Sequence, residues 1–288
     1  SNINQSIEKL INKKFIYSKN LKDENILKKT VLKFTIPAIP ILNKNNTLKT
    51  VYHDEIKQVE RKENEVFILA GGHGKRLFPL TSNRPKPMLR VGNVPLLESI
   101  IYNLKESGFY RINLSVNFLQ EKIIEYFGNG EKFGVRIKYI KERKPLGTGG
   151  SLSLLKKNFN KPIIVLNGDL YTNLNFSALL EYHKKNKNDL TICSKKIDKE
   201  IEYGVISKNK DDLIKEKPIH SYNIFAGILI INQSLIKKID KNKFIKMTDI
   251  INKFSKKNYK IGIFPIHELW FDIGNYQTLF NVNNGANV

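Results

Sequence analysis

The sequence predicts an α/β fold, a Rossmann-like and mostly parallel sheet that is sandwiched by helices. From residue 65 onward, short apolar runs of strand length alternate with segments that carry apolar residues at helical spacing. The first run, 66–69, and a later one, 163–166, are apolar at successive positions, as strands buried on both faces are. Such alternation indicates a parallel sheet with helices on both faces.

Each element is predicted from its periodicity and from the residues that interrupt it. The segment 95–107 has apolar residues at positions 96, 97, 100, 101 and 104 and is followed by Gly108, which ends a helix well. The same criteria predict further strands at 112–116, 135–140 and 190–193 and further helices at 119–127, 149–156 and 176–184.

A smaller α+β region precedes this domain. We place the boundary so that residues 1–62 form the first region and 63–288 the second, with the charged run 58–64 as the linker. In the first region we expect a helix within 3–11, a strand at 15–17, a helix after Asp23, an extended segment at 36–42, a turn at 43–46 and a strand at 48–52.

This order of elements resembles one CBS motif, and Ile39-Pro-Ile-Leu-Asn-Lys-Asn45 matches its most recognisable segment. CBS motifs pair into modules that bind adenine nucleotides, and one motif is visible here. The resemblance therefore leaves two interpretations open, a site for an adenine nucleotide and a packing or oligomerising appendage.

Composition narrows the classes of protein that fit. The net charge is +22, but 42 of the 49 basic residues are lysines scattered along the chain, which favours compositional bias over a nucleic-acid site. No apolar run approaches the about 20 residues that span a bilayer. The single cysteine, Cys193, lies in a predicted strand and indicates a small buried side chain in a reducing cytoplasm. We expect neither a nucleic-acid nor a membrane partner.

A glycine-rich loop follows the first strand of the second domain. Gly71, Gly72 and Gly74 let backbone N–H groups approach an anion, and Lys75 and Arg76 follow at once. The spacing fits neither a Walker loop, which needs four residues before its Gly-Lys pair, nor a dinucleotide-binding G-x-G-x-x-G loop. The loop therefore predicts a polyphosphate site.

Two carboxylates are candidates for a metal. Asp169 follows a buried strand directly after Asn167-Gly168, and Asp272 lies in Trp270-Phe-Asp-Ile-Gly274. Magnesium prefers one or two carboxylates together with the phosphate oxygens of a substrate. The alternative is that each aspartate caps a turn or helix.

The chain resembles the sugar-1-phosphate nucleotidyltransferases at several motifs. Their signature L-A-G-G-x-G-x-R-L-x-P-L-T matches 69–81 at every fixed position, and Pro85-Lys-Pro87 follows at the expected distance. Further matches lie at 90–98, 146–150, 167–169, 216–218 and 270–274, so that the resemblance covers about 64–284. It implies Mg²⁺-dependent transfer of a nucleotidyl group from a nucleoside triphosphate to a sugar 1-phosphate.

The layout of a CBS-like region and a transferase domain resembles bacterial enzymes that form GDP-sugars for surface glycans of the legionaminic-acid type. GTP is therefore the favoured nucleotide. Whether the chain forms a homo-oligomer is left open. A second hypothesis is a catalytically silent regulatory protein that binds a nucleotide sugar. The presence of Arg76, Lys86, Asp169 and Asp272 argues against it.

The resemblance also implies roles for individual residues. The catalytic residues would be Arg76, Lys86 and Asp169, and the metal ligands Asp169 and Asp272. The nucleotide would contact Leu69, Ala70, Gly71, Gly72, Gly74, Lys75 and Asn117, and the sugar phosphate Glu142, Gly147, Thr148, Glu216 and Lys217.

Two departures from the family pattern concern the sugar. Gly147-Thr-Gly-Gly150 replaces Gly-Thr-Ala-Gly, and Ile224-Phe-Ala-Gly-Ile-Leu229 replaces a segment with Asn and Tyr. The second change removes an amide and a phenol and leaves the sugar undetermined. The five histidines share no ligand spacing, so we expect no histidine metal site, and we interpret His73, the one nearest the loop, as incidental.

Overall fold

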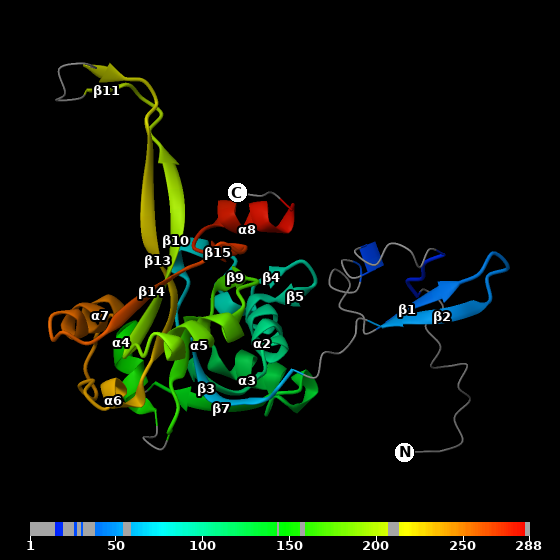
Figure 1. Cartoon of the computed structure of the whole chain (residues 1–288), viewed down its shortest axis with the longest axis horizontal. Coiled ribbons are helices and arrows are strands. Elements are labelled where there is room, and N and C mark those ends of the chain that lie inside the picture. Colours follow the sequence, from blue (N-terminus) through cyan, green and yellow to red (C-terminus); the bar gives the residue numbers. More distant parts are fainter. Residues whose placement is uncertain are drawn as a thin grey trace. The chain divides into compact units, whose positions relative to one another are not determined.

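The structure is a computed structural model, and it describes residues 15–19, 26–27, 30, 38–53, 59–142, 144–155, 159–206 and 213–285. The chain forms two compact units, Ser1–Val59 and Glu60–Val288. Figure 1 shows the two units. In the described part, no helix is long and apolar enough to cross a membrane.

The first unit contains a two-stranded antiparallel sheet, β1 (Ala38–Leu42) and β2 (Leu48–His53), joined by the predicted turn. Its buried core consists of Leu27, Ile39 and Ile41. The strand predicted at 15–17 is wrong: residues 15–17 are not in a strand, and the one β-bridge in the described segment 15–19 joins Ser18 to Ile41. The rings of Phe15 and Tyr17 pack on each other with centroids 5.9 Å apart. The helix expected at 3–11 and most of the helix after Asp23 lie outside the described residues.

The second unit is built on a seven-stranded sheet in the order β14-β10-β13-β8-β3-β6-β7. Every neighbouring pair is parallel except those that include β13, which runs antiparallel to β10 and β8. The predicted α/β fold with a mostly parallel sheet is confirmed. The strands are β3 (Lys62–Leu69), β6 (Phe109–Val116), β7 (Arg136–Lys141), β8 (Ile163–Asn167), β10 (Leu190–Glu200), β13 (Ile219–Ile231) and β14 (Ile261–Pro265).

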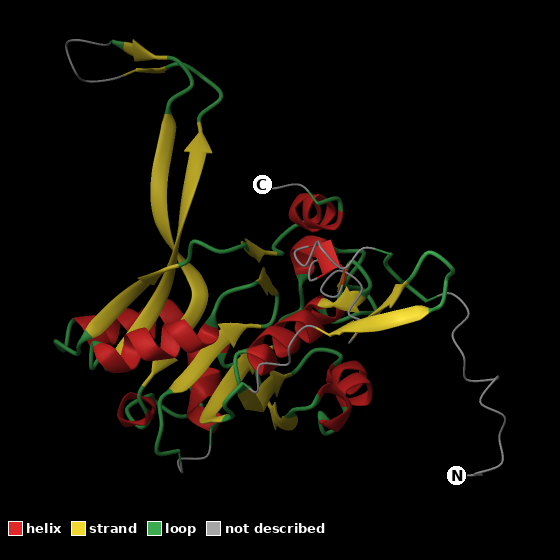
Figure 2. Cartoon of the chain, turned by 45° about the vertical axis from the view of Figure 1, so that its right-hand side comes forward, coloured by secondary structure: helices red, strands yellow, loops and turns green. Residues whose placement is uncertain are grey.

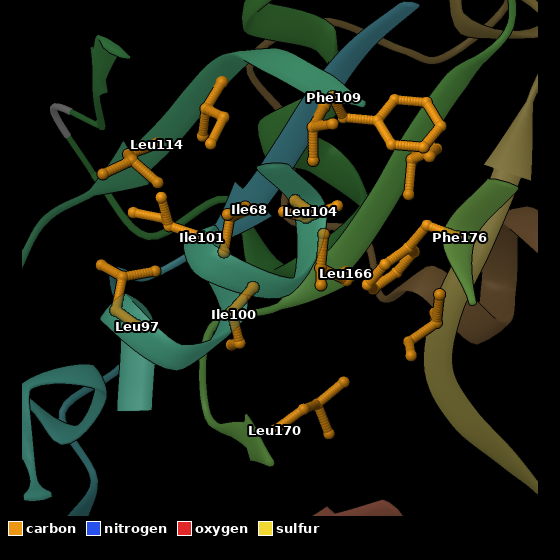
Figure 3. Close-up of a cluster of buried hydrophobic side chains, with 14 of the residues drawn as sticks. Ile68, Leu97, Ile100, Ile101, Leu104, Phe109, Leu114, Leu166, Leu170 and Phe176 are labelled. Carbon is orange, nitrogen blue, oxygen red and sulfur yellow. The ribbon is translucent and has the colours of Figure 1, made fainter. Parts of the chain in front are cut away.

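Helices cover both faces because the central strands are apolar on both. On β3, Val66 and Ile68 pack into one core with α2 and α5, whereas Phe67 points into a second core with α7. Figure 3 shows the first core, in which side chains of α2 meet those of β3, β6 and β8. The α-helices are α2 (Leu96–Glu106), α3 (Gln120–Phe127), α4 (Gly147–Gly150), α5 (Phe176–Lys185), α6 (Gln233–Ile236), α7 (Met247–Ser255) and α8 (Tyr276–Asn283).

Short elements connect this frame. The 3₁₀-helices are η2 (Lys75–Leu77), η3 (Lys86–Met88), η4 (Glu131–Phe133) and η5 (Ser151–Leu154). Two small antiparallel pairs are β4 (Arg90–Val91) with β5 (Val94–Pro95), and β9 (Leu170–Thr172) with β15 (Trp270–Asp272).

A two-stranded arm extends from the sheet (Figures 1 and 2). β14 pairs with β10 only at 190–194 and β8 with β13 only at 228–231, whereas β10 and β13 remain paired as far as Glu200 and Ile219. At its tip lie β11 (Val205–Ile206) and β12 (Ile214–Lys215). We call residues 195–206 and 213–227 the arm. The strand predicted at 190–193 is only the start of β10, which continues into the arm as far as Glu200.

Two predicted boundaries are wrong. Residues 62–64 belong to β3 rather than to a linker, because Lys62 pairs with Phe109 and the Asn64 side chain is buried and donates to the carbonyl of Pro162 at 2.8 Å. The helix predicted at 149–156 is instead the pair α4 and η5, since the glycines of α4 lie against the backbone of the segment before α7.

Candidate active site

The glycine-rich loop and Asp169 leave the sheet from the same edge. β3 and β8 are parallel neighbours, with Leu69 opposite Asn167 at their carboxyl ends. From β3 the chain continues to β6 on one side, while β8 lies on the other, so this is the switch point at which ligands bind in open α/β sheets. The topology therefore brings the two predicted motifs together.

Gly168 makes the close approach between these two segments. Its N–H donates to the carbonyl of Leu69 at 2.8 Å, and a Cβ at this position would lie only 2.9 Å from that oxygen. Glycine is the residue that permits such an approach. It sets Asp169 directly beside the start of the loop.

The loop is held open by its own backbone and by Thr81. Gly74 has φ +63°, a conformation that favours glycine, and its carbonyl accepts a hydrogen bond from the buried Thr81 hydroxyl at 3.0 Å. At Gly72 a Cβ would meet nothing within 4 Å, so the loop presents open space where an anion can approach. Sequence reasoning included Thr81 in the motif without assigning its role, which is to fasten the end of the loop.

Three predicted cations have different surroundings. Lys75 and Arg76 are exposed on η2, and the Arg76 guanidinium lies beside Gly274, where a Cβ would be 3.5 Å from its Nη2. Lys86 is buried, with a side chain 10% exposed, and its ammonium forms an ion pair with the carboxylate of Asp169. The exposed cations can meet a ligand from solvent, whereas Lys86 lies at the base of the site.

The two predicted carboxylates converge. Asp272 ends β15 opposite Leu170 of β9, and the N–H of Ile273 donates to the Asp169 carbonyl at 3.1 Å. Lys86 Nζ is 3.8 Å from Asp272 Oδ1, so its ammonium lies between both side chains. Burial and the neighbouring Asp169 carboxylate raise the pKa of Asp272, and the charges of Lys86 and Arg76 partly oppose this rise.

The carboxylates fit a divalent cation. Asp169 Oδ1 is buried and has no hydrogen-bond partner, which is costly for a charged oxygen unless a cation binds it. Within the described residues, neither side chain accepts a hydrogen bond from a backbone N–H, so a capping role finds no support there. No group of three or more His, Cys, Asp or Glu that could hold a metal occurs in this part either. Asp169 and Asp272 could thus hold a magnesium ion whose other ligands come from phosphate and water.

Asn117 and Glu142 form a frame beside the loop. The Glu142 carboxylate accepts from the Ser115 hydroxyl at 2.6 Å and from the N–H of Leu146 at 3.1 Å, and its carbonyl accepts from the Asn117 amide at 2.9 Å. A Cβ at Gly71 would lie 3.2 Å from that of Asn117, so this frame borders the loop. Glu142 therefore holds the local structure, and its predicted contact with a sugar stays a prediction.

The glycines after Leu146 pack against the segment that precedes α7. Gly147 has φ +72° and a Cβ there would be 2.6 Å from the carbonyl of Ile245, while the Thr148 hydroxyl accepts from the N–H of Met247 at 2.9 Å. A Cβ at Gly149 would be 2.5 Å from Ile250 Cδ1. The same Cβ would lie 2.9 Å from the backbone carbonyl oxygen of Lys246, so the backbone before α7 favours glycine at 149, where many members of the resembled family have alanine.

Glu216 and Lys217 lie elsewhere, on the arm between β12 and β13. A Cβ at Gly204, also on the arm, would be 3.1 Å from Glu216 Oε2, and Lys217 has φ +42°. Within the described residues, the Lys217 ammonium forms no ion pair with Asp169 or Asp272. Their predicted role at the sugar phosphate stays a prediction.

The remaining side chains considered in the sequence are two that lie buried in the fold, Cys193 and His183, and one in the glycine-rich loop, His73. Cys193 is buried, as predicted, and burial raises the pKa of its thiol. His183 is buried between Thr191 and Asn232, at 2.8 and 3.1 Å. His73 stacks on Phe118 with centroids 4.7 Å apart, a contact across two loops that no sequence spacing reveals.

Fold and site together define a class of protein. Backbone amides and cations that suit a polyphosphate lie at the switch point of an α/β sheet, next to a carboxylate pair that suits a divalent metal. Such a site suits reactions of phosphate-bearing substrates.

The chain belongs to the nucleotidyl transferase family, whose sequence model matches residues 65–287. It is 35% identical over 217 residues to a mannose-1-phosphate guanyltransferase of Yarrowia lipolytica, an alignment that covers 72% of this chain and 60% of that protein. The chain thus spans about 60% of the length of the curated relatives that it matches.

Solved structures show the same fold. HddC from Yersinia pseudotuberculosis, also solved in complex with GMP-PN, is 25% identical with a TM-score of 0.62 over 77% of this chain and 99% of HddC. A putative glucose-1-phosphate thymidylyltransferase from Bacillus anthracis is 24% identical with a TM-score of 0.64 over 77% of this chain and 94% of that one.

Proposed function

We propose that this chain transfers a nucleotidyl group from a nucleoside triphosphate, with GTP favoured, to a sugar 1-phosphate. The observation that carries the proposal is the convergence of the glycine-rich loop, Lys86 and the two aspartates at one edge of the sheet. Membership of the nucleotidyl transferase family supports the same proposal.

The reaction joins two anions. A phosphate oxygen of the sugar 1-phosphate attacks the α-phosphorus of the triphosphate, the bond from that phosphorus to the α,β-bridging oxygen breaks, and pyrophosphate leaves. No covalent enzyme intermediate is needed, so positioning and charge neutralisation supply the catalysis. The site offers groups for both tasks.

The residues around the loop fit the triphosphate. The amides of 69–72 and 74, with Lys75 and Asn117, would bind the nucleotide, and the exposed Arg76 would bind the departing β- and γ-phosphates bidentately. Lys86 would neutralise charge at the α-phosphate. Asp169 and Asp272 would hold Mg²⁺, which when bound supplies further neutralisation of phosphate charge.

The sugar site rests on the less direct assignments. Glu142 borders the loop, whereas Gly147 and Thr148 pack against the segment before α7. Glu216 and Lys217 would have to reach the sugar phosphate from the arm. The relatives named mannose-1-phosphate guanyltransferases favour GTP and a hexose or amino-hexose 1-phosphate as the first substrates to test. Phe225 and Leu229, which depart from the family pattern, leave the choice of sugar to experiment.

For residues 1–62 we retain the CBS-like assignment as a proposal. It is supported by the β1–turn–β2 hairpin, whose buried Ile39 and Ile41 form its core with Leu27. Calorimetric titration of the full chain with AMP and ATP tests the nucleotide-sensor interpretation: saturable binding of AMP, which lacks the triphosphate, favours a sensor, and its absence favours an appendage. The single buried cysteine fits a cytoplasmic protein.

The direct test is pyrophosphate release with Mg²⁺, in which GTP, ATP, CTP, UTP and dTTP are each combined with a panel of hexose and amino-hexose 1-phosphates. We expect release that requires one triphosphate and one sugar phosphate together, with GTP the best triphosphate. A chain that binds nucleotide but stays silent across the panel would instead be a regulatory protein that binds nucleotide sugars.

A further inference from the structure

We propose that Lys86 is an internal counter-ion that a divalent cation must displace, so that metal binding releases this lysine toward the phosphates. The inference rests on the proposed function, since it assumes that Asp169 and Asp272 hold the metal. The proposed function gives Lys86 and the metal separate roles, and the inference adds that the Lys86 ammonium and the divalent cation compete for the two carboxylates.

The geometry places Lys86 where the cation would bind. Its ammonium forms an ion pair with Asp169 Oδ2 and lies 3.8 Å from Asp272 Oδ1. Among the described residues, Lys86 is thus the cation within ion-pair distance of both carboxylates. A metal bound by both aspartates would share this space with a group that already carries a positive charge.

The Asp169 carboxylate is only half satisfied by this arrangement. Oδ2 is paired with Lys86, whereas Oδ1 is buried and has no partner. A divalent cation on Oδ1 would therefore meet the ammonium across a single carboxylate. Charges of the same sign a few ångströms apart repel strongly at a partly buried site, so the ammonium would have to move.

Lys86 has the means to move while its backbone stays fixed. Its backbone is held in η3 between Pro85 and Pro87, and the N–H of Leu89 donates to the Lys86 carbonyl at 3.0 Å. The ammonium sits on a flexible four-carbon stem. A change of side-chain rotamers therefore suffices to carry the charge from Asp169 to a phosphate beside the loop.

The test is the affinity of the metal-free full chain for Mn²⁺ alone, without nucleotide, measured by electron paramagnetic resonance. We expect Lys86→Met, which keeps the length of the side chain but removes its charge, to bind Mn²⁺ at least tenfold more tightly than wild type, about 1.4 kcal/mol. Lys75→Met removes a cation of the same loop region that lies outside the ion pair and should stay within twofold of wild type. Asp169→Asn should remove the binding.

Equal or weaker Mn²⁺ binding by Lys86→Met would overturn the proposal, as would the absence of binding by both wild type and this variant. A measurement on the wild-type chain decides the matter if the variant does not fold: acetylation of Lys86, followed by mass spectrometry, should be slow in metal-free protein and several times faster with Mg²⁺. Unchanged labelling would contradict the release.

Failure of this inference can be told apart from failure of the proposed function, because neither readout involves turnover. A chain that releases pyrophosphate as proposed, but whose Mn²⁺ affinity is unaffected by Lys86→Met, would lose only the competition. A chain that shows the competition but no turnover would lose only the transferase assignment.

Discussion

Adding one methyl group at Gly168 should damage activity far more than its cost in stability implies. The Cβ of Gly168→Ala would lie 2.9 Å from the Leu69 carbonyl and 3.4 Å from Ala70 Cα. Ordinary van der Waals contact of a Cβ with such an atom begins at 3.4 Å, so the end of β8 must move away from the Leu69 oxygen by about half an ångström. Asp169, the next residue, moves with it.

The magnitude follows from that displacement. Overpacking a tight site costs about 1–3 kcal/mol of unfolding free energy. A misplacement of about 1 Å costs about a hundredfold in rate, so half of it should reduce kcat about tenfold or more. Urea unfolding measures the first quantity, and pyrophosphate release at saturating substrates, corrected for the folded fraction, measures the second.

Gly262→Ala is the matched control. Gly262 lies on β14 at the far edge of the sheet, where a Cβ would clash with the buried Asn188 amide. We expect a similar loss of stability, about 1–3 kcal/mol, with kcat unchanged. A destabilised Gly168→Ala chain that keeps wild-type kcat would refute the idea that this approach positions Asp169.

Three further predictions concern other sites. Asp169→Asn should stay folded by circular dichroism yet lose about a hundredfold or more of kcat, because it removes a charge at the reacting centre; near-normal turnover would take Asp169 out of the site. Burial lowers the pKa of His183, so on acidification the unfolded chain takes up this proton at a higher pH than the folded chain does. The free energy of unfolding should therefore fall as the pH drops below about 6.5. A His183→Gln chain whose free energy of unfolding depends on pH as steeply as that of wild type would contradict this. Gly149→Ala should destabilise the chain by about 1–3 kcal/mol despite the better helix propensity of alanine, because its Cβ would lie 2.9 Å from the backbone carbonyl oxygen of Lys246 as well as 2.5 Å from Ile250 Cδ1. An increased urea midpoint would show that the segment at the start of α7 yields easily.

Local patterns were enough to predict five of the seven strands of the sheet, but not β13 and β14. The apolar runs of β3 and β8 are buried on both faces, and such runs of successive apolar residues predict buried strands. The glycine-rich loop follows β3 directly, and Asp169 follows β8 after Gly168. Since parallel neighbours end at one edge, the fold class alone brought these motifs together.

Contacts between distant residues could not be predicted in this way. The burial of Lys86 between Asp169 and Asp272 depends on three segments meeting, and spacing along the chain does not encode it. The strand predicted at 15–17 had suitable residues but pairs with no strand among the described residues, whereas the polar 62–64 joined β3 because the Asn64 side chain donates to the carbonyl of Pro162. The outer parts of β10 and β13, residues 195–200 and 219–223, are mostly polar and exposed, so they lack the apolar run that marks a core strand.

Identification of the reaction product decides whether the nucleotidyl group passes to the sugar phosphate. Wild-type chain, Mg²⁺ and GTP would be incubated with ¹³C-labelled mannose 1-phosphate, and the products would be resolved by mass spectrometry. We expect a labelled GDP-sugar formed in a one-to-one ratio with pyrophosphate, and none when Mg²⁺ is chelated. Pyrophosphate accompanied by GMP and unchanged sugar phosphate would contradict this expectation, because the nucleotidyl group would then have passed to water.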